Sequence, residues 1–149
     1  FLALRSQLPM SALYEVLPDR LIIASDPVFI FGKGELGAEG YDRLMPLADA
    51  LRTLVAQLPE HSPWRLRIEG HSDRRPLRAN PYFESNWELS AARALSMLRF
   101  LVTQGLAKDR LSAVGLAETR LRDPAKDKAA HRRNRRIEVH LEYAEAASQ

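Results

Sequence analysis

The chain has 149 residues, of which 46% are hydrophobic and 28% charged, and it contains no cysteine. These values are typical of one globular domain and exclude a disordered chain, a disulfide scaffold, a cysteine-ligated zinc and a thiol nucleophile. The net charge is +3, and 18 of the 22 Lys and Arg residues are Arg, which favours fixed contacts with carboxylates or phosphates. No apolar run approaches the roughly 20 residues of a membrane helix.

The first half of the sequence predicts a strand followed by a helix. Residues 1–19 are interpreted as an N-terminal extension or linker, in which two prolines bracket a possible short helix from Ser11 to Leu17. An apolar run at 20–25 predicts a buried strand. Apolar residues at three- and four-residue steps then predict a helix over about 38–58, which Pro46 should kink or start late.

Alternating polar and apolar residues at 65–69 predict a half-exposed strand, and a polar loop separates it from a second helix. Ser85 and Glu88 form a capping box at the start of that helix, and Gly105 marks its end. Its buried stripe is expected to be apolar: Trp87, Ala91, Ala94, Leu95, Leu98, Leu101 and Val102. The face turned away from this stripe is expected to consist of Asn86, Ser90, Arg93 and Met97.

The rest of the chain predicts two more strands, at 111–114 and 136–142, joined by an irregular connection over 116–130. Strands joined through helices imply crossover units. We therefore expect an α/β (α+β) two-layer sandwich, a mixed sheet of order β-α-β-α-β-β with both helices on one face. Residues 20–143 would form this domain and residues 144–149 a flexible tail.

A polar turn, Gly70-His71-Ser72-Asp73, follows the second predicted strand. His71 and Asp73 are candidate metal ligands, and Ser72 is a candidate nucleophile. However, the other histidines add no partner at a metal-binding spacing, and Ser72 lacks the second glycine of a nucleophile elbow. We therefore predict neither a metal site nor a catalytic residue here, but a turn whose side chains bond local backbone amides.

The polar face at the start of the second helix is a candidate anion site. Asn86 and Arg93 are seven residues, or about 10 Å, apart along the helix axis. The free backbone amides and the dipole at this end favour negative charge. The alternative is a solvated face on which Arg93 pairs with a nearby acid.

A basic run, His131-Arg132-Arg133-Asn134-Arg135-Arg136, precedes the last predicted strand. Such a run is typical of a solvated or membrane-surface patch, and it could also neutralise nucleic-acid phosphates. However, no aromatic residue is interleaved to stack on bases, and the charge is too modest and too mixed for a nucleic-acid footprint. We expect no nucleic-acid partner.

Three segments in this order resemble the OmpA-like peptidoglycan-binding domain: Ile68-Glu69-Gly70-His71-Ser72-Asp73, Ser85-Asn86-Trp87-Glu88-Leu89-Ser90-Ala91-Ala92-Arg93-Ala94 and Arg132-Arg133-Asn134-Arg135-Arg136-Ile137-Glu138-Val139. The Ser-Asn-Trp-Glu-Leu-Ser form most resembles the MotB branch, the stator subunit of the flagellar motor. One departure is Ala117, which stands where the family's Gly-x-Gly-Glu segment has its second glycine. Another is the long, arginine-rich stretch at 74–83, which fits the stator branch better.

The resemblance implies a site for the meso-diaminopimelate of the peptidoglycan stem peptide, which carries an ammonium and a carboxylate on one carbon. Asp73 would take the ammonium, and Arg93 would take the carboxylate in a forked contact. The competing possibility is that Asp73 and Arg93 pair with each other. The ligand-binding residues expected from the resemblance are Ser72, Asp73, Asn86, Leu89, Ser90, Arg93, Arg135 and Arg136.

Within this set, Asn86 would orient the ligand or the loop, and Ser72 keeps the hydroxyl of the commoner threonine. Arg135 and Arg136 would support the pocket or touch the glycan. The resemblance further implies a non-enzymatic cell-wall anchor without a cofactor. It would be the periplasmic part of a single-pass inner-membrane stator subunit, with the chain forming a homodimer. Its missing upstream segment would contact a membrane-embedded stator partner.

Several alternatives stay open at this point. Within the family, the chain could be an outer-membrane or lipoprotein-type tether, or the stator of a non-flagellar ion-driven machine. From other classes, a basic nucleic-acid-binding module predicts salt-dependent duplex binding that does not need Asp73. A hydrolase predicts release of muropeptides, but the sequence offers no general acid or nucleophile for it.

Overall fold

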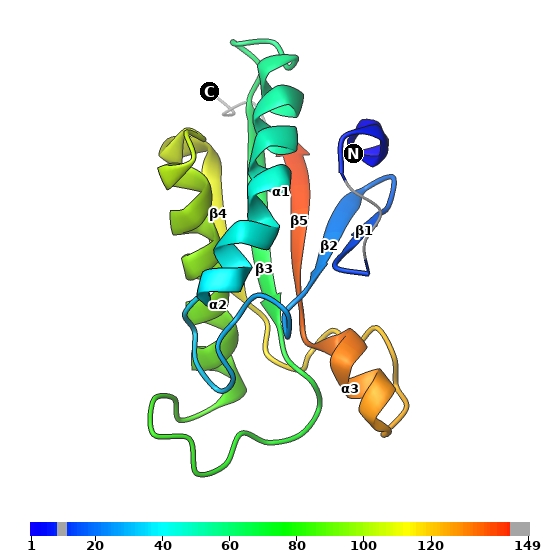
Figure 1. Cartoon of the computed structure of the whole chain (residues 1–149), viewed down its shortest axis with the longest axis vertical. Helices are drawn as coiled ribbons and strands as arrows, with labels where there is room; N and C mark the ends of the chain where they lie inside the picture. Colours follow the sequence, from blue (N-terminus) through cyan, green and yellow to red (C-terminus); the bar gives the residue numbers. More distant parts are fainter. Residues whose placement is uncertain (9–11, 144–149) are drawn as a thin grey trace, which may run out of the picture.

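The computed structural model describes residues 1–8 and 12–143, which are organised around a five-stranded sheet (Figure 1). The strands are β1 (Tyr14–Val16), β2 (Arg20–Ala24), β3 (Trp64–His71), β4 (Leu111–Gly115) and β5 (Arg136–Tyr143). Their order across the sheet is β1-β2-β5-β3-β4. β3 and β4 are parallel, and the other neighbouring pairs are antiparallel. The sheet is therefore mixed, as predicted.

Helices complete the described chain: η1 (Leu2–Ser6), α1 (Ala38–Ala56), α2 (Asn86–Thr103), η2 (Lys108–Arg110) and α3 (Lys128–Asn134), where η denotes a 3-10 helix. The long helices α1 and α2 pack on the sheet, whereas α3 lies beyond the end at which β5 begins (Figure 1). This two-layer arrangement confirms the predicted fold class. None of the helices in the described ranges is long and apolar enough to cross a bilayer.

The segment before β2 differs from the prediction. The helix expected over Ser11–Leu17 is wrong in its described part, because Tyr14–Val16 forms an edge strand antiparallel to β2. Tyrosine and valine favour strands, and a seven-residue helix between prolines is too short to be stable alone. Leu4 and Leu13 are buried in the same core as the sheet. The tail expected at 144–149 lies outside the described residues.

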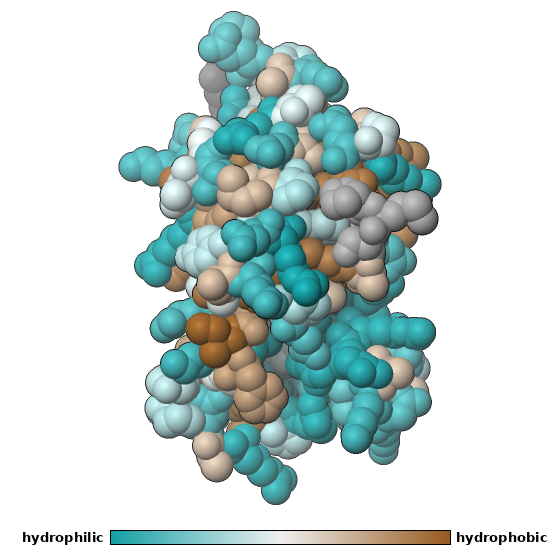
Figure 2. Space-filling model, viewed as in Figure 1, coloured by the Kyte–Doolittle hydropathy of each residue, from teal (hydrophilic) through white to brown (hydrophobic). Residues whose placement is uncertain are grey.

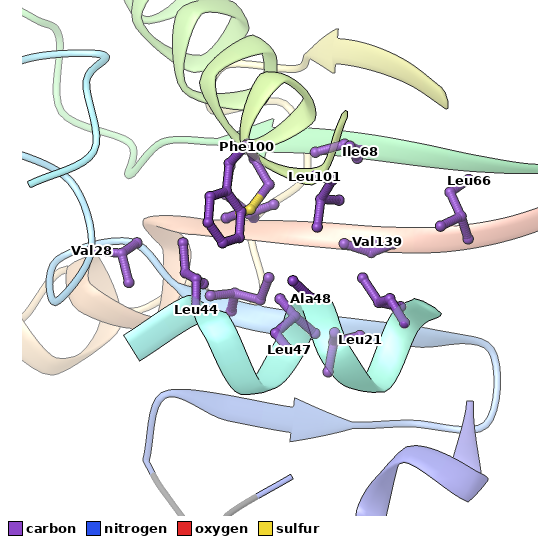
Figure 3. Close-up of a cluster of buried hydrophobic side chains, with 14 of the residues drawn as sticks. Leu21, Val28, Leu44, Leu47, Ala48, Leu66, Ile68, Phe100, Leu101 and Val139 are labelled. Carbon is purple, nitrogen blue, oxygen red and sulfur yellow. The ribbon is translucent and has the colours of Figure 1, made fainter. Parts of the chain in front are cut away.

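The main hydrophobic core lies between the sheet and the two long helices (Figure 3). Fully burying a leucine-sized side chain stabilises a fold by about 1.5–3 kcal/mol, so this layer holds α1 and α2 on the sheet. α1 is continuous across Pro46, so this proline does not mark a late start. The labelled core residues are Leu21, Val28, Leu44, Leu47, Ala48, Leu66, Ile68, Phe100, Leu101 and Val139.

α2 presents a different face to the protein interior from the predicted one. Trp87 and Leu95, both expected in its stripe, are 51% and 39% exposed. Periodicity counts polar residues as exposed, so it misses a face whose polar side chains are buried. The buried residues are Asn86, Leu89, Ser90, Arg93, Ala94, Met97, Phe100 and Leu101. The polar strip that was expected to face away is therefore turned inward.

Gly70 allows α2 to pack directly on the end of β3. A Cβ atom at this position would lie 2.0 Å from the carbonyl oxygen of Ser90. We expect Gly70→Ala to push α2 away and to lower the free energy of unfolding by about 1–3 kcal/mol or more, measured by urea unfolding. Gly37→Ala is the control, because its Cβ would lie 3.7 Å from the nearest atom, and it should cost at most about 1 kcal/mol. Equal losses in both variants would contradict the packing argument.

Candidate ligand-binding site

A cavity of about 590 Å³ opens at one end of the sheet. Because β5 is antiparallel to both β2 and β3, Arg136 at its start lies beside Ala24 and His71 at the ends of those strands. The cavity is therefore lined by the loops after β2 and β3, the first turns of α2 and the residue before β5. The lining residues are Asp26, Phe29, Phe31, Gly32, Ser72, Asp73, Arg75, Pro76, Leu77, Arg78, Asn86, Leu89, Arg93 and Arg135.

Part of the rim of this cavity is apolar. Figure 2 shows hydrophobic surface over the segment that leads into α1, on an otherwise mostly hydrophilic face. Ile30 and Phe31 in this segment are 39% and 99% exposed. The segment is a tight loop closed by a bridge between Phe29 and Leu36. A fully exposed aromatic ring at the cavity gives a bound molecule an apolar surface beside the charged groups.

Asp73 supplies an ionised carboxylate to the cavity. Its Oδ1 accepts hydrogen bonds from the backbone N–H (2.9 Å) and the Nε (3.2 Å) of Arg75. Its Oδ2 accepts from Arg75 Nη2 (2.8 Å) and Arg135 Nη1 (2.7 Å). Burial alone would raise the pKa of Asp73, but the bonds from Arg75 and Arg135 outweigh it and lower this pKa to about 2. The carboxylate is charged at neutral pH.

Arg93 supplies a buried cation from α2. Its Nε donates to the carbonyl of Lys33 (3.0 Å), and its guanidinium lies 5.2 Å from the centre of the Phe29 ring. Across residues 1–8 and 12–143, no carboxylate lies within ion-pair distance of Arg93, and its two terminal nitrogens donate no hydrogen bond. The competing possibility that Asp73 and Arg93 pair directly is therefore wrong. Burial lowers the pKa of Arg93 to about 10, so the side chain stays cationic at neutral pH.

Arg135 connects two acidic residues at the edge of the cavity. Its Nε and Nη2 donate to the two carboxylate oxygens of Asp26 (2.8 Å each), and its Nη1 donates to Asp73. The bonds to Asp26 raise the pKa of Arg135 further above its usual range. Asp26 was not predicted as a site residue, because only the pairing of β2 with β5 brings it beside Arg135. No local pattern in the sequence carries that information.

Asn86 holds the loop between β3 and α2 in place. Its Nδ2 donates to the backbone carbonyl of Arg75 (2.9 Å) and to the carboxylate of Glu118 (3.1 Å). The helix begins as predicted, with the hydroxyl of Ser85 accepting from the N–H of Trp87 (3.2 Å). Asn86 thus fixes the backbone of the loop that carries Asp73 and Arg75.

Ser72 and Ser90 reach a neighbouring loop through their backbone and side chain, respectively. The N–H of Ser72 donates to the carbonyl of Ala117 (2.9 Å), and the hydroxyl of Ser90 accepts from the N–H of Ala117 (3.0 Å). Ala117 has a φ of +51°, a left-handed conformation that costs about 1–2 kcal/mol for residues with a Cβ. This explains why glycine suits the corresponding place in the family's motif. Leu89 lines the cavity, but Ser90 does not.

The structure does not bring Arg136 to the cavity. Side chains alternate along β5, so Arg136 faces the side of the sheet away from α1 and α2, where its Nε donates to Glu138 (2.6 Å). The basic run at 131–136 is also not one patch, because its first four residues lie in α3, a helix that was not predicted. Arg132 and Arg133 are exposed, whereas His131, Asn134 and Arg136 are buried.

The OmpA family profile matches residues 28–135. The chain belongs to the OmpA family. Motility protein B of Escherichia coli (strain K12) is 36% identical over 134 residues, which cover 88% of this chain and 41% of that protein. Motility protein B of Bacillus subtilis (strain 168) is 32% identical over 120 residues, which cover 80% and 43%. The chain thus spans less than half the length of these two relatives.

Solved structures agree with this assignment. A protein described as MotB-like from Desulfovibrio vulgaris has a TM-score of 0.77 and 29% identity, covering 89% of this chain and 82% of that chain. The cell wall anchor of the T6SS from Pseudomonas aeruginosa has a TM-score of 0.70 and 30% identity, covering 95% and 90%. The predicted resemblance to the MotB branch of the family is confirmed, and the family is one of structural anchor domains.

The other side of the sheet carries a second group of ionisable residues. Glu69 and Glu138 face each other across β3 and β5, and His140 Nε2 lies 3.3 Å and 3.0 Å from their carboxylates. The ligand atoms of these three residues lie within 4.8 Å of one another, a spacing that could suit a metal ion. However, Arg67 and Arg136 already pair with the two carboxylates, at 2.7 Å and 2.6 Å. We interpret the group as an ion-pair network.

This network makes stability depend on pH. Hydrogen bonds to Glu138 and Glu69 raise the pKa of His140 to about 9. The contribution of charged His140 to the free energy of unfolding is therefore complete below the unfolded pKa of about 6.5. It is lost as pH rises through 9. We expect urea unfolding to show a loss of about 1–3 kcal/mol between pH 6.5 and 9.5, which His140→Gln removes and the exposed control His61→Gln retains. An unchanged slope in His140→Gln would contradict the assignment.

Proposed function

We propose that the chain binds peptidoglycan non-covalently, with the diaminopimelate of the stem peptide in the cavity between Asp73 and Arg93. The observation that carries this proposal is a buried, unpaired guanidinium in the same cavity as an ionised carboxylate. A carboxylate would accept two parallel hydrogen bonds from the free terminal nitrogens of Arg93, the strongest geometry for such a pair. An ammonium on the same carbon would be directed towards Asp73.

The charge balance of the cavity supports an anionic group on the ligand. Two carboxylates and four guanidinium groups line it, which leaves two net positive charges. A buried cation without a partner is costly, so a carboxylate at Arg93 would relieve an existing penalty. The charged side chains are Asp26, Asp73, Arg75, Arg78, Arg93 and Arg135.

We further propose that this binding anchors a membrane machine to the cell wall, with the chain forming the periplasmic part of a single-pass inner-membrane protein. Similarity to Motility protein B supports the stator of an ion-driven motor, with a homodimeric chain and a membrane-embedded stator partner. The second candidate is the cell wall anchor of a secretion system. The Pseudomonas aeruginosa structure favours it, because the match covers nearly the whole of both chains. Neither role includes a catalytic step.

Binding to isolated sacculi tests the site. We expect Asp73→Asn and Arg93→Gln each to lower the fraction that sediments with sacculi by about tenfold or more, because each removes one charge-assisted contact. Arg99→Ala is the matched control, since Arg99 is exposed on the same helix and should behave as the wild type. Thermal unfolding would verify that all variants fold. The proposal would be contradicted if both site variants sedimented with sacculi as fully as the wild type. It would also be contradicted if the wild type did not sediment with them.

A chimera tests the larger role. Replacing the matched region of Escherichia coli Motility protein B with this chain should restore swimming in soft agar to a strain that lacks the native protein. The same chimera with Arg93→Gln should reach the membrane but fail to support swimming, because the stator would lack its fixed attachment. A wild-type chimera that is stably produced in the membrane but immotile would contradict the stator role and favour the secretion-system anchor.

A further inference from the structure

Arg75 fills the acidic half of the cavity. A carboxylate offers about four acceptor positions, two on each oxygen. At Asp73, two are taken by the backbone N–H and Nε of Arg75, one by Arg75 Nη2 and one by Arg135 Nη1. An incoming ammonium therefore finds no free acceptor on Asp73, and one of these donors must leave before it can bind.

The side chain of Arg75 is the donor that can leave. The backbone N–H is part of a tight turn, and the carbonyl of Arg75 is held by Asn86 (2.9 Å). The side chain of Arg135 is 22% exposed and is fixed at its other edge by Asp26. The side chain of Arg75 is 60% exposed, and among the residues described it forms an ion pair with Asp73 alone. Its release needs only a side-chain rotation and no opening of the loop.

We propose that Arg75 is a built-in competitor for the cationic half of the ligand, so that it lowers the affinity of the site for ligands that bind through Asp73. This inference rests on the proposed binding of diaminopimelate. An isolated amine would have to displace a forked ion pair and would gain only its own pair with Asp73. A ligand whose carboxylate already holds Arg93 presents its ammonium at a high effective concentration and can complete the exchange. Arg75 thus lowers the affinity of every ligand that binds through Asp73, and a ligand that also gains Arg93 can offset this cost.

Calorimetric titration of the chain tests this proposal with two probes. The first is the tripeptide L-Ala-γ-D-Glu-meso-diaminopimelate, and the second is pimelate, a dicarboxylate without an ammonium. Removal of an exposed ion pair that competes with the ligand should tighten tripeptide binding by about two- to fivefold in Arg75→Ala. Pimelate needs only the cationic half of the site, so its affinity should stay the same or fall.

Arg74→Ala is the matched control. It removes the same charge from the same loop, but the side chain of Arg74 donates to the carbonyl of Pro124 (3.2 Å) and not to Asp73. We expect its tripeptide affinity to equal or fall below that of the wild type. In the wild-type chain, the 15N resonance of Arg75 Nε should also move towards the value of a free guanidinium when the tripeptide is added.

The outcomes separate this inference from the proposed function. If the wild type binds the tripeptide and Arg75→Ala binds it no tighter than Arg74→Ala, the competitor role is wrong and peptidoglycan binding stands. An equal gain for pimelate would also overturn it, because Arg75 would then act on the anionic half of the ligand. If no variant binds the tripeptide and the wild type is not retained by sacculi, both proposals are wrong.

Discussion

The antiparallel pairing of β5 with both β2 and β3 is the constraint on which the site depends. It places the start of β5 beside the ends of both neighbours, so Arg135 reaches Asp26 after β2 and Asp73 after β3. Gly70 then lets the first turns of α2 approach the same edge, which brings Arg93 into the cavity. Three segments that are distant in the sequence thus meet through backbone pairing, and α2 joins them through its packing at Gly70.

Alternation along β5 separates two electrostatic systems that share adjacent residues. Arg135 precedes the strand and lines the cavity, whereas Arg136 begins it and belongs to the ion-pair network with Glu138. In that network every carboxylate has a cationic partner, so it stabilises the sheet and offers no unpaired charge. In the cavity, Arg93 has no carboxylate partner among the residues described. The contrast identifies the cavity, and not the network, as the place where a charged ligand gains most.

The sequence predicted those parts of the fold that local patterns determine. The apolar spacing of α1 and the capping signal at Ser85 located both long helices, and alternation located β3 and β5. The edge strand β1 was missed because a short apolar segment between prolines has no distinct period. The face of α2 was wrong because Asn86 and Arg93 are polar yet buried. Asp26 and Arg75 could not be found, since their roles depend on pairing across the sheet and on one side-chain rotamer.

The two charged halves of the cavity contribute differently to the proposed binding. Exchanging a guanidinium for an ammonium at Asp73 replaces one ion pair with another, so the free energy gained there is reduced by the pair that is lost. Placing a carboxylate on Arg93 creates a pair where none existed and offsets the cost of a buried cation. The carboxylate would therefore supply the larger share of the affinity and the ammonium the smaller share. For an anchor on a polymer with many identical stem peptides, a modest affinity per site suffices, because a dimer of such chains would gain the rest through avidity.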